Sequence, residues 1–160
     1  MARRRRWWWR ALRWTALAVL AALLLVAAWQ ALTWPDVAAL AISNPETTAF
    51  IDAYRKRESR AGREPRLQWR WVPSSRISPE LKHAVLVAED IDFYSHDGFD
   101  TFELKEAVRD AWEEGKPLRG ASTLSQQTVK NLWLSPSRNP LRKLKETLLT
   151  VQLERELGKA

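Results

Sequence analysis

The segment Ala88–Asp100 reads AEDIDFYSHDGFD, and the segment Gly120–Glu146 reads GASTLSQQTVKNLWLSPSRNPLRKLKE. The first segment begins at the end of one predicted helix, and the apolar stripe of that helix continues as far as Glu89. The second contains two helix starts before it reaches Glu146. Together they predict a mainly α-helical fold that carries two carboxylates on separate helices.

Caps and apolar spacing predict where the helices lie. Ser78 followed by Pro79 begins one helix, and Asn139 followed by Pro140 begins another. The last helix has an apolar stripe that we expect to pack on the core, made of Leu141, Leu144, Leu148 and Val151. One expected helix begins at Pro79 and continues through Ala88, and the next runs from Phe102 to Glu114. A third runs from a cap at Ser122 to about Leu134, and a fourth begins at Pro140 and is still strong at Leu157.

Two stretches upstream leave their structure open. Residues 51–64 are charged and poor in apolar side chains, which predicts an exposed helix ending near Gly62 or a linker. Leu67–Val72 alternates apolar and polar residues, which is typical of a short strand or an extended arm.

An uncharged run near the N-terminus predicts a membrane anchor. The 22 residues from Trp14 to Pro35 carry no charge, and a helix of that length spans about 33 Å, enough to cross a bilayer. Arginines precede the run, and the positive-inside bias keeps them in the cytoplasm. The alternative is a cleaved signal peptide. These arginines are Arg3, Arg4, Arg5, Arg6, Arg10 and Arg13.

The net charge of +7 describes this N-terminal tip more than the rest of the chain. After residue 13 the basic and acidic residues almost balance, so we predict no nucleic-acid partner. The chain has no cysteine, which excludes disulfides and thiolate metal sites.

Glu89 lies four residues after Val85, so it continues the apolar stripe of its helix. We expect a carboxylate at that position to be desolvated, which raises the pKa of a carboxyl group and suits a general base. The alternative is an ion-paired or capping glutamate. Asp90 is predicted to brace the following turn, and His96 to satisfy backbone groups.

A polar face follows in the second segment. Thr123, Gln127 and Lys130 are spaced for one helix face, which presents a hydroxyl, an amide and an ammonium group to sugar oxygens and a pyrophosphate. Arg142 and Glu146 are four residues apart and are expected to line a cleft facing the phosphate, directly or through a divalent cation. The alternatives are an ordinary solvated face and a surface ion pair.

The two segments, with RKLKE at their end, resemble three motifs of the peptidoglycan glycosyltransferases (glycosyltransferase family 51). The stretches TTAF at Thr47–Phe50 and WVPSSRISP at Trp71–Pro79 resemble the monofunctional biosynthetic members. The resemblance implies a lysozyme-like, mainly α-helical domain that polymerises lipid II into glycan strands with a divalent cation, Mg²⁺ or Mn²⁺. Ala121 and Ser125 depart mildly from the usual motif.

The resemblance also implies the roles of residues. Glu89 matches the catalytic base, and Glu146 matches a second essential glutamate near the donor pyrophosphate, where it is also the candidate metal ligand. Substrate-binding positions are matched by Thr123, Gln127, Lys130 and Arg142, and positions that shape the first motif by Asp90, Phe93, His96 and Gly98.

The predicted organisation has four parts. They are a basic cytoplasmic tip at 1–13, a transmembrane anchor at 14–35, a juxtamembrane segment at 36–66 and the glycosyltransferase domain at 67–160. The resemblance implies further motifs after Lys159, so we expect this domain to be C-terminally incomplete. The expected location is the inner membrane, with a single pass and the catalytic domain in the periplasm.

The expected partners are lipid II, the growing glycan strand, the membrane and proteins of cell-wall synthesis. The loop Gly115–Gly120, with Trp112 nearby, is expected to touch lipid or move with substrate, or to be a plain solvent loop. Two other functions stay open: a lysozyme-like enzyme that cleaves peptidoglycan, and a non-catalytic docking protein of the wall-synthesis machinery.

Overall fold

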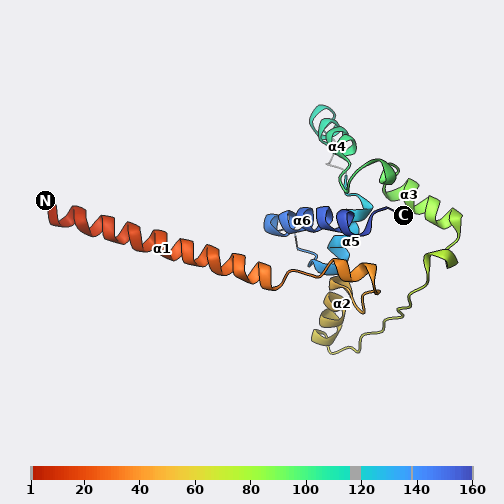
Figure 1. Cartoon of the computed structure of the whole chain (residues 1–160), viewed down its shortest axis with the longest axis horizontal. Coiled ribbons are helices and arrows are strands. Elements are labelled where there is room, and N and C mark those ends of the chain that lie inside the picture. The colour runs from red at the N-terminus through yellow and green to blue at the C-terminus, as the bar shows by residue number, and fades with distance from the viewer. Residues whose placement is uncertain (1, 116–119, 138, 160) are drawn as a thin grey trace. The chain divides into compact units, whose positions relative to one another are not determined.

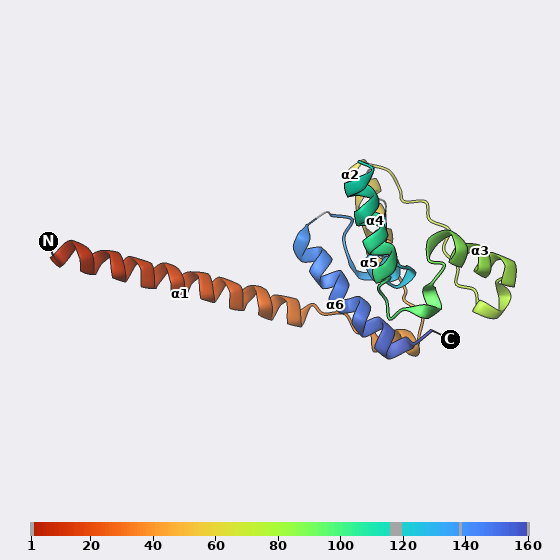
Figure 2. The same ribbon diagram turned by 90° about the horizontal axis from the view of Figure 1, so that it is seen from above.

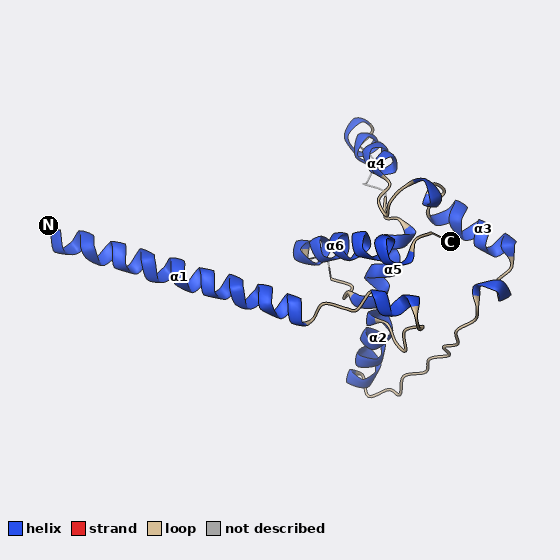
Figure 3. Cartoon of the chain, viewed as in Figure 1, coloured by secondary structure: helices blue, strands red, loops and turns tan. Residues whose placement is uncertain are grey.

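The computed structural model describes residues 2–115, 120–137 and 139–159, without the side chains of residues 2–7 and 11. These residues form helices and loops and contain no strand, so the predicted mainly α-helical fold is confirmed (Figures 1 and 3). The α-helices are α1 (Ala2–Leu32), α2 (Ala49–Arg60), α3 (Pro79–Glu89), α4 (Thr101–Glu113), α5 (Leu124–Trp133) and α6 (Pro140–Leu157). Short 3₁₀ turns are η1 (Ala38–Ala41), η2 (Ser74–Arg76) and η3 (Phe93–Ser95).

The chain divides into two compact units, Met1–Asp36 and Val37–Ala160. The first unit is α1, in which the stretch Trp8–Leu32 is long and apolar enough to cross a membrane. Its hydroxyl groups are satisfied within the helix: Thr15 Oγ1 donates to the Leu12 carbonyl at 2.9 Å, and Thr33 Oγ1 to the Trp29 carbonyl at 2.7 Å. Internal pairing of polar groups is what a helix in lipid requires.

The core of the second unit lies where α5 packs on α6 (Figure 2). Val129 of α5 and Leu149 of α6 are fully buried, and Leu153 lies one turn further along α6. Helix α2 packs on α5 and brings Ile51 into this core. The turn η1 packs on α6 and brings Val37, the residue just before it, into the same core. Burying each of these aliphatic side chains contributes about 1.5–3 kcal/mol before the entropy of ordering is subtracted.

The buried face of α6 differs from the predicted one. Leu141, Leu144 and Leu148 of the predicted stripe are exposed, and Val151 is half-buried. The buried face instead carries Glu146, Leu149, Thr150 and Leu153, which have the same helical spacing. Both the predicted face and the observed face of this helix fit the spacing rule. The observed face can bury Glu146 because its carboxylate is ion-paired.

Helix α3 also presents its apolar stripe to solvent. Leu81 and Val85 are exposed, and none of the residues of α3 is buried. The predicted start is confirmed, because Ser78 Oγ accepts a hydrogen bond from the Leu81 amide at 3.2 Å and Pro79 takes the first helical position. Local capping therefore sets where α3 begins, but it does not bury the stripe.

Helix α2 ends as predicted near Gly62, whose φ is +67°. The Arg63 guanidinium donates to both carboxylate oxygens of Glu58, at 2.7 and 3.0 Å. This hydrogen-bonded pair lowers the pKa of Glu58 and raises that of Arg63. Beyond it, Leu67–Val72 is an extended arm and forms no strand, and Trp71 Nε1 donates to the Pro45 carbonyl at 3.0 Å.

Gly98 joins the segment after η3 to α6 by close packing. Its φ is +86°, a region that L side chains rarely adopt. A Cβ atom at this position would lie 2.8 Å from Cγ2 of Thr150 and 2.9 Å from Cγ of Glu154. Both the backbone conformation and the lack of space therefore require glycine.

We predict that Gly98→Ala lowers the free energy of unfolding by about 2–4 kcal/mol, from the left-handed backbone and the overpacking together. Gly62→Ala is the matched control, because Gly62 also has a positive φ but has no atom within 4 Å of the added Cβ. Urea unfolding followed by circular dichroism measures both variants. Equal losses in the two variants would show that the contact with α6 contributes nothing.

Candidate active site

A cleft of about 250 Å³ brings the two sequence segments together. Its walls come from the end of α3, the start of α4 and the segment that leads into α5. The lining residues are Val87, Ala88, Glu89, Asp90, Ile91, Asp100, Glu103, Gly120, Ala121, Ser122 and Thr123. Four of them are carboxylates, so the cleft is acidic.

Glu89 is the last residue of α3 and is exposed to solvent, so the prediction that it is desolvated is wrong. The reason is that α3 buries no residue, and the stripe that Glu89 continues faces water. Its carboxylate is nevertheless held, because Gln127 Nε2 donates to Glu89 Oε2 at 2.9 Å. The same nitrogen lies 3.3 Å from the Ser122 carbonyl. One amide thus ties the carboxylate at the end of α3 to the start of α5.

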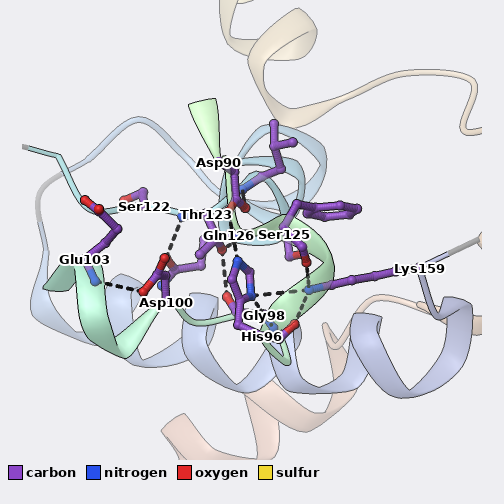
Figure 4. Close-up of polar contacts among 12 residues, drawn as sticks. Asp90, His96, Gly98, Asp100, Glu103, Ser122, Thr123, Ser125, Gln126 and Lys159 are labelled. Atoms are coloured by element: carbon purple, nitrogen blue, oxygen red, sulfur yellow. Dashed lines mark hydrogen bonds and ion pairs between the residues drawn. The ribbon is translucent and has the colours of Figure 1, made fainter. Parts of the chain in front are cut away.

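Asp90, the residue after Glu89, is buried, and its side chain is 2% exposed. Its Oδ1 contacts His96 Nε2 at 2.9 Å, and its Oδ2 accepts the Leu124 amide at 2.8 Å (Figure 4). The Gly98 amide donates to His96 Nδ1 at 3.1 Å, so Nε2 carries the ring proton and donates it to Asp90. The predictions that Asp90 braces the following turn and that His96 satisfies backbone groups are confirmed.

Thr123 is the N-cap of α5, one residue after the predicted cap at Ser122. Its hydroxyl accepts the Gln126 amide at 3.3 Å and donates to the Gly98 carbonyl at 2.7 Å. The Gln126 side chain accepts the Thr123 amide at 3.1 Å and completes a capping box. With 2% of the residue exposed, this hydroxyl is committed to the fold. Thr123 also lines the cleft, and its predicted contact with substrate stays a prediction.

Glu146 forms a buried ionic cluster on α6. Its Oε2 lies 2.6 Å from Arg142 Nη1, and its Oε1 lies 2.5 Å from Lys143 Nζ. The Glu146 side chain is 3% exposed and that of Arg142 is 18% exposed, so the pair is not a surface ion pair. Removing one partner of a buried pair typically costs about 3–5 kcal/mol.

The predicted donor-side residues are not brought into the cleft of Glu89. Lys130, Arg142 and Glu146 are absent from its lining. Lys130 is half-buried on α5 and makes no ion pair with the described residues. Arg142 Nε is buried and has no hydrogen-bond partner among the residues that the structure describes. The basic residues predicted for the donor side therefore lie outside the lining of the acidic cleft.

The Glu146 carboxylate does not fit a metal ion in this arrangement, because both of its oxygens are already paired with cations. Within the described ranges, no group of three or more His, Cys, Asp or Glu residues is arranged to hold a metal. Of the predicted lipid-contacting loop, residues 116–119 lie outside the described residues, and Trp112 is 89% exposed on α4.

A family model described as Transglycosylase matches residues 57–160. The chain belongs to this transglycosylase family. The match begins within α2 and includes every segment that lines the cleft. It confirms the resemblance that the motifs carry.

Relatives named biosynthetic peptidoglycan transglycosylase agree with the assignment to the transglycosylase family. The protein of Laribacter hongkongensis (strain HLHK9) is 40% identical over 152 residues, which are 92% of this chain and 65% of the relative. The protein of Azoarcus sp. (strain BH72) is 41% identical over 146 residues, covering 89% of this chain and 62% of the relative. The protein of Neisseria gonorrhoeae is 43% identical over 110 residues, covering 69% and 47%. The chain thus spans less than two thirds of the length of these relatives.

Sequence reasoning missed four residues in or near the site. Asp100 caps α4 by accepting the Glu103 amide at 2.8 Å, and both residues line the cleft. Glu154 accepts a hydrogen bond from Ser125, and Lys159 contacts the turn at His96. The cap at Asp100 has a local signal, an aspartate just before the helix, whereas Lys159 is 63 residues from its partner and has none.

We predict that Thr123→Ala lowers the free energy of unfolding by about 1–2 kcal/mol, because the variant loses a helix cap. Thr123→Ser keeps a hydroxyl that can make both bonds and should unfold close to wild type. Urea unfolding of the full chain measures the difference. Unchanged stability of Thr123→Ala together with weaker substrate binding would favour the substrate-contacting role of this residue.

Proposed function

We propose that this chain acts as a peptidoglycan glycosyltransferase that joins lipid II units into glycan strands. The observation that carries the proposal is Glu89, a solvent-accessible carboxylate at the edge of a cleft, held by Gln127 within the segment matched to the transglycosylase family. The names of the relatives support the same substrate class.

In this proposal Glu89 is the general base. Its exposure leaves the carboxylate open to an incoming sugar, and a base must come within hydrogen-bond reach of the proton that it takes. Glu89 removes the proton of the acceptor's 4-hydroxyl as that oxygen attacks the anomeric carbon of the donor. The bond to the pyrophosphate breaks, undecaprenyl pyrophosphate leaves, and the configuration inverts. Gln127 orients the carboxylate by donating to Oε2.

The donor's pyrophosphate needs cations, and α5 and α6 supply them. We assign this role to Lys130 and Arg142, with Lys143 beside them. Glu146 holds Arg142 and Lys143 by ion pairs, so its role is to orient these cations. A guanidinium that is fixed in this way loses little further side-chain entropy when it binds a phosphate.

The apolar helix α1 is compatible with a membrane anchor. We propose an inner-membrane location, with the arginine-rich start of α1 in the cytoplasm and the unit that begins at Val37 in the periplasm. An anchored domain can reach a lipid-linked sugar without leaving the membrane surface. The growing glycan strand and other wall-synthesis proteins are the proposed partners.

One observation favours a second function, the cleavage of finished peptidoglycan. The acidic cleft holds Glu89 together with Asp100 and Glu103 from the start of α4. Glycoside hydrolases typically use a pair of carboxylates that flank the bond to be cleaved. Incubation with lipid II and, separately, with finished glycan distinguishes the two. Polymer from lipid II supports transfer, and fragments from the glycan support cleavage.

We predict that Glu89→Gln abolishes polymerisation of lipid II while the fold is kept, because the amide has the same shape but cannot accept the proton. The loss should be at least about 100-fold, the usual contribution of a general base. Gel analysis of labelled glycan measures the product, and circular dichroism measures the fold.

Glu156→Gln is the matched control, since Glu156 is an exposed glutamate on α6 outside the cleft. This variant should polymerise lipid II at the wild-type rate. If Glu89→Gln also retains that rate, the assignment of the base is wrong. If a wall-synthesis phenotype and partner binding both survive Glu89→Gln, the chain works as a docking protein.

A divalent cation, Mg²⁺ or Mn²⁺, is proposed on the resemblance alone, and EDTA treatment tests whether polymerisation needs it. Because both Glu146 oxygens are ion-paired, we predict no saturable binding when the chain is titrated calorimetrically with MgCl₂ or MnCl₂ without substrate. A one-to-one site that disappears in Glu146→Gln would contradict this prediction.

A further inference from the structure

Lys159 has an environment that is unusual for a lysine. Its side chain is 12% exposed, and its ammonium contacts the carbonyl oxygens of Phe93 and His96. The same nitrogen lies 3.3 Å from His96 Nδ1, 3.6 Å from Glu154 Oε1 and 4.6 Å from the centre of the Phe93 ring. An ammonium group has three donors, and each of them has an acceptor within this pocket.

These contacts fix the state of the His96 ring. Nδ1 lies next to two donors, Lys159 and the Gly98 amide, so Nδ1 must accept and the proton stays on Nε2 (Figure 4). Only that tautomer lets Nε2 donate to Asp90 Oδ1. Lys159 also holds the backbone of the turn by two carbonyl groups, so the ring cannot move independently of the turn.

A continuous series of hydrogen bonds then leads to the proposed base. Asp90, held by His96, accepts the Leu124 amide at the first residue of α5. Gln127 lies one turn further along α5 and donates to Glu89. Each contact in this series from Lys159 to Glu89 is 3.3 Å or shorter, apart from the covalent path through α5.

We propose that Lys159 is a positioning residue for the proposed general base Glu89, acting by holding the turn that carries His96 and, through His96, the carboxylate of Asp90. The proposal rests on the proposed glycosyl transfer. Lys159 does not line the cleft. Its connection to the lining residue Asp90 runs through His96. A lysine with a merely structural role would affect unfolding but not the hydrogen bond from His96 Nε2 to Asp90 in the folded protein.

The first test reads the ring proton of His96 directly. The chain has two histidines, His96 and the exposed His83, so a ¹⁵N-histidine spectrum of the full chain in detergent is simple and contains its own reference. Because the Gly98 amide keeps Nδ1 unprotonated, we expect the Nε2–H tautomer in wild type and in Lys159→Met, but faster exchange of the Nε2 proton with water in the variant, where Lys159 no longer holds the turn. Lys56→Met, at an exposed lysine on α2, should leave the spectrum unchanged.

The second test restores the ammonium group. Because the chain has no cysteine, Lys159→Cys can be alkylated at this position alone with 2-bromoethylamine, which rebuilds a lysine-like side chain. We expect kcat for lipid II polymerisation to fall on the order of 100-fold in Lys159→Met and in unmodified Lys159→Cys, with KM nearly unchanged. Aminoethylation should restore kcat and the slow exchange of the His96 ring proton, whereas alkylation with iodoacetamide should restore neither.

Exchange of the His96 ring proton at the wild-type rate in folded Lys159→Met, or a wild-type kcat in that variant, would overturn the proposal. If Lys159→Met does not fold, the aminoethylated and carbamidomethylated forms of Lys159→Cys provide the same comparison. Should wild type itself fail to polymerise lipid II, the glycosyltransferase proposal fails, and the ¹⁵N spectra still decide whether Lys159 sets the state of His96.

Discussion

The Asp90 carboxylate is the interaction on which the rest of the site depends. One oxygen pairs with His96 in the turn after α3, and the other receives the first amide of α5. A negative charge at a helix N-terminus is favoured by the helix dipole. Burial strengthens both contacts because little water competes for the carboxylate. A single side chain therefore joins two segments 34 residues apart and determines where the cleft lies.

Features with local causes were predictable from the sequence. The caps at Ser78 and Asn139 lie where expected, since each side chain bonds an amide within three residues of it. The bracing of the turn by Asp90, six residues before His96, and the pairing of Arg142 with Glu146 also follow from short spacing. The membrane-length helix is evident from composition alone.

Features set by packing between distant segments were not predictable. Two faces of α6 satisfy the helical spacing rule, and only the neighbours η1 and α5 decide that Leu149 is buried and Leu144 exposed. Glu89 follows an apolar stripe that no element covers, so its expected desolvation did not occur. The Thr123 hydroxyl donates to the carbonyl of Gly98, 25 residues away. Pairing at such distances leaves no periodic signal in a single sequence.

The acidic lining of the cleft favours the binding of uncharged groups over anions. Glu89, Asp100 and Glu103 repel a diphosphate at short range, whereas an uncharged sugar ring meets only hydrogen-bond acceptors. The basic side chains of α6 lie outside this lining and attract the opposite kind of group. A ligand that carries both an uncharged ring and a diphosphate would therefore bind in one orientation, with its diphosphate outside the acidic lining.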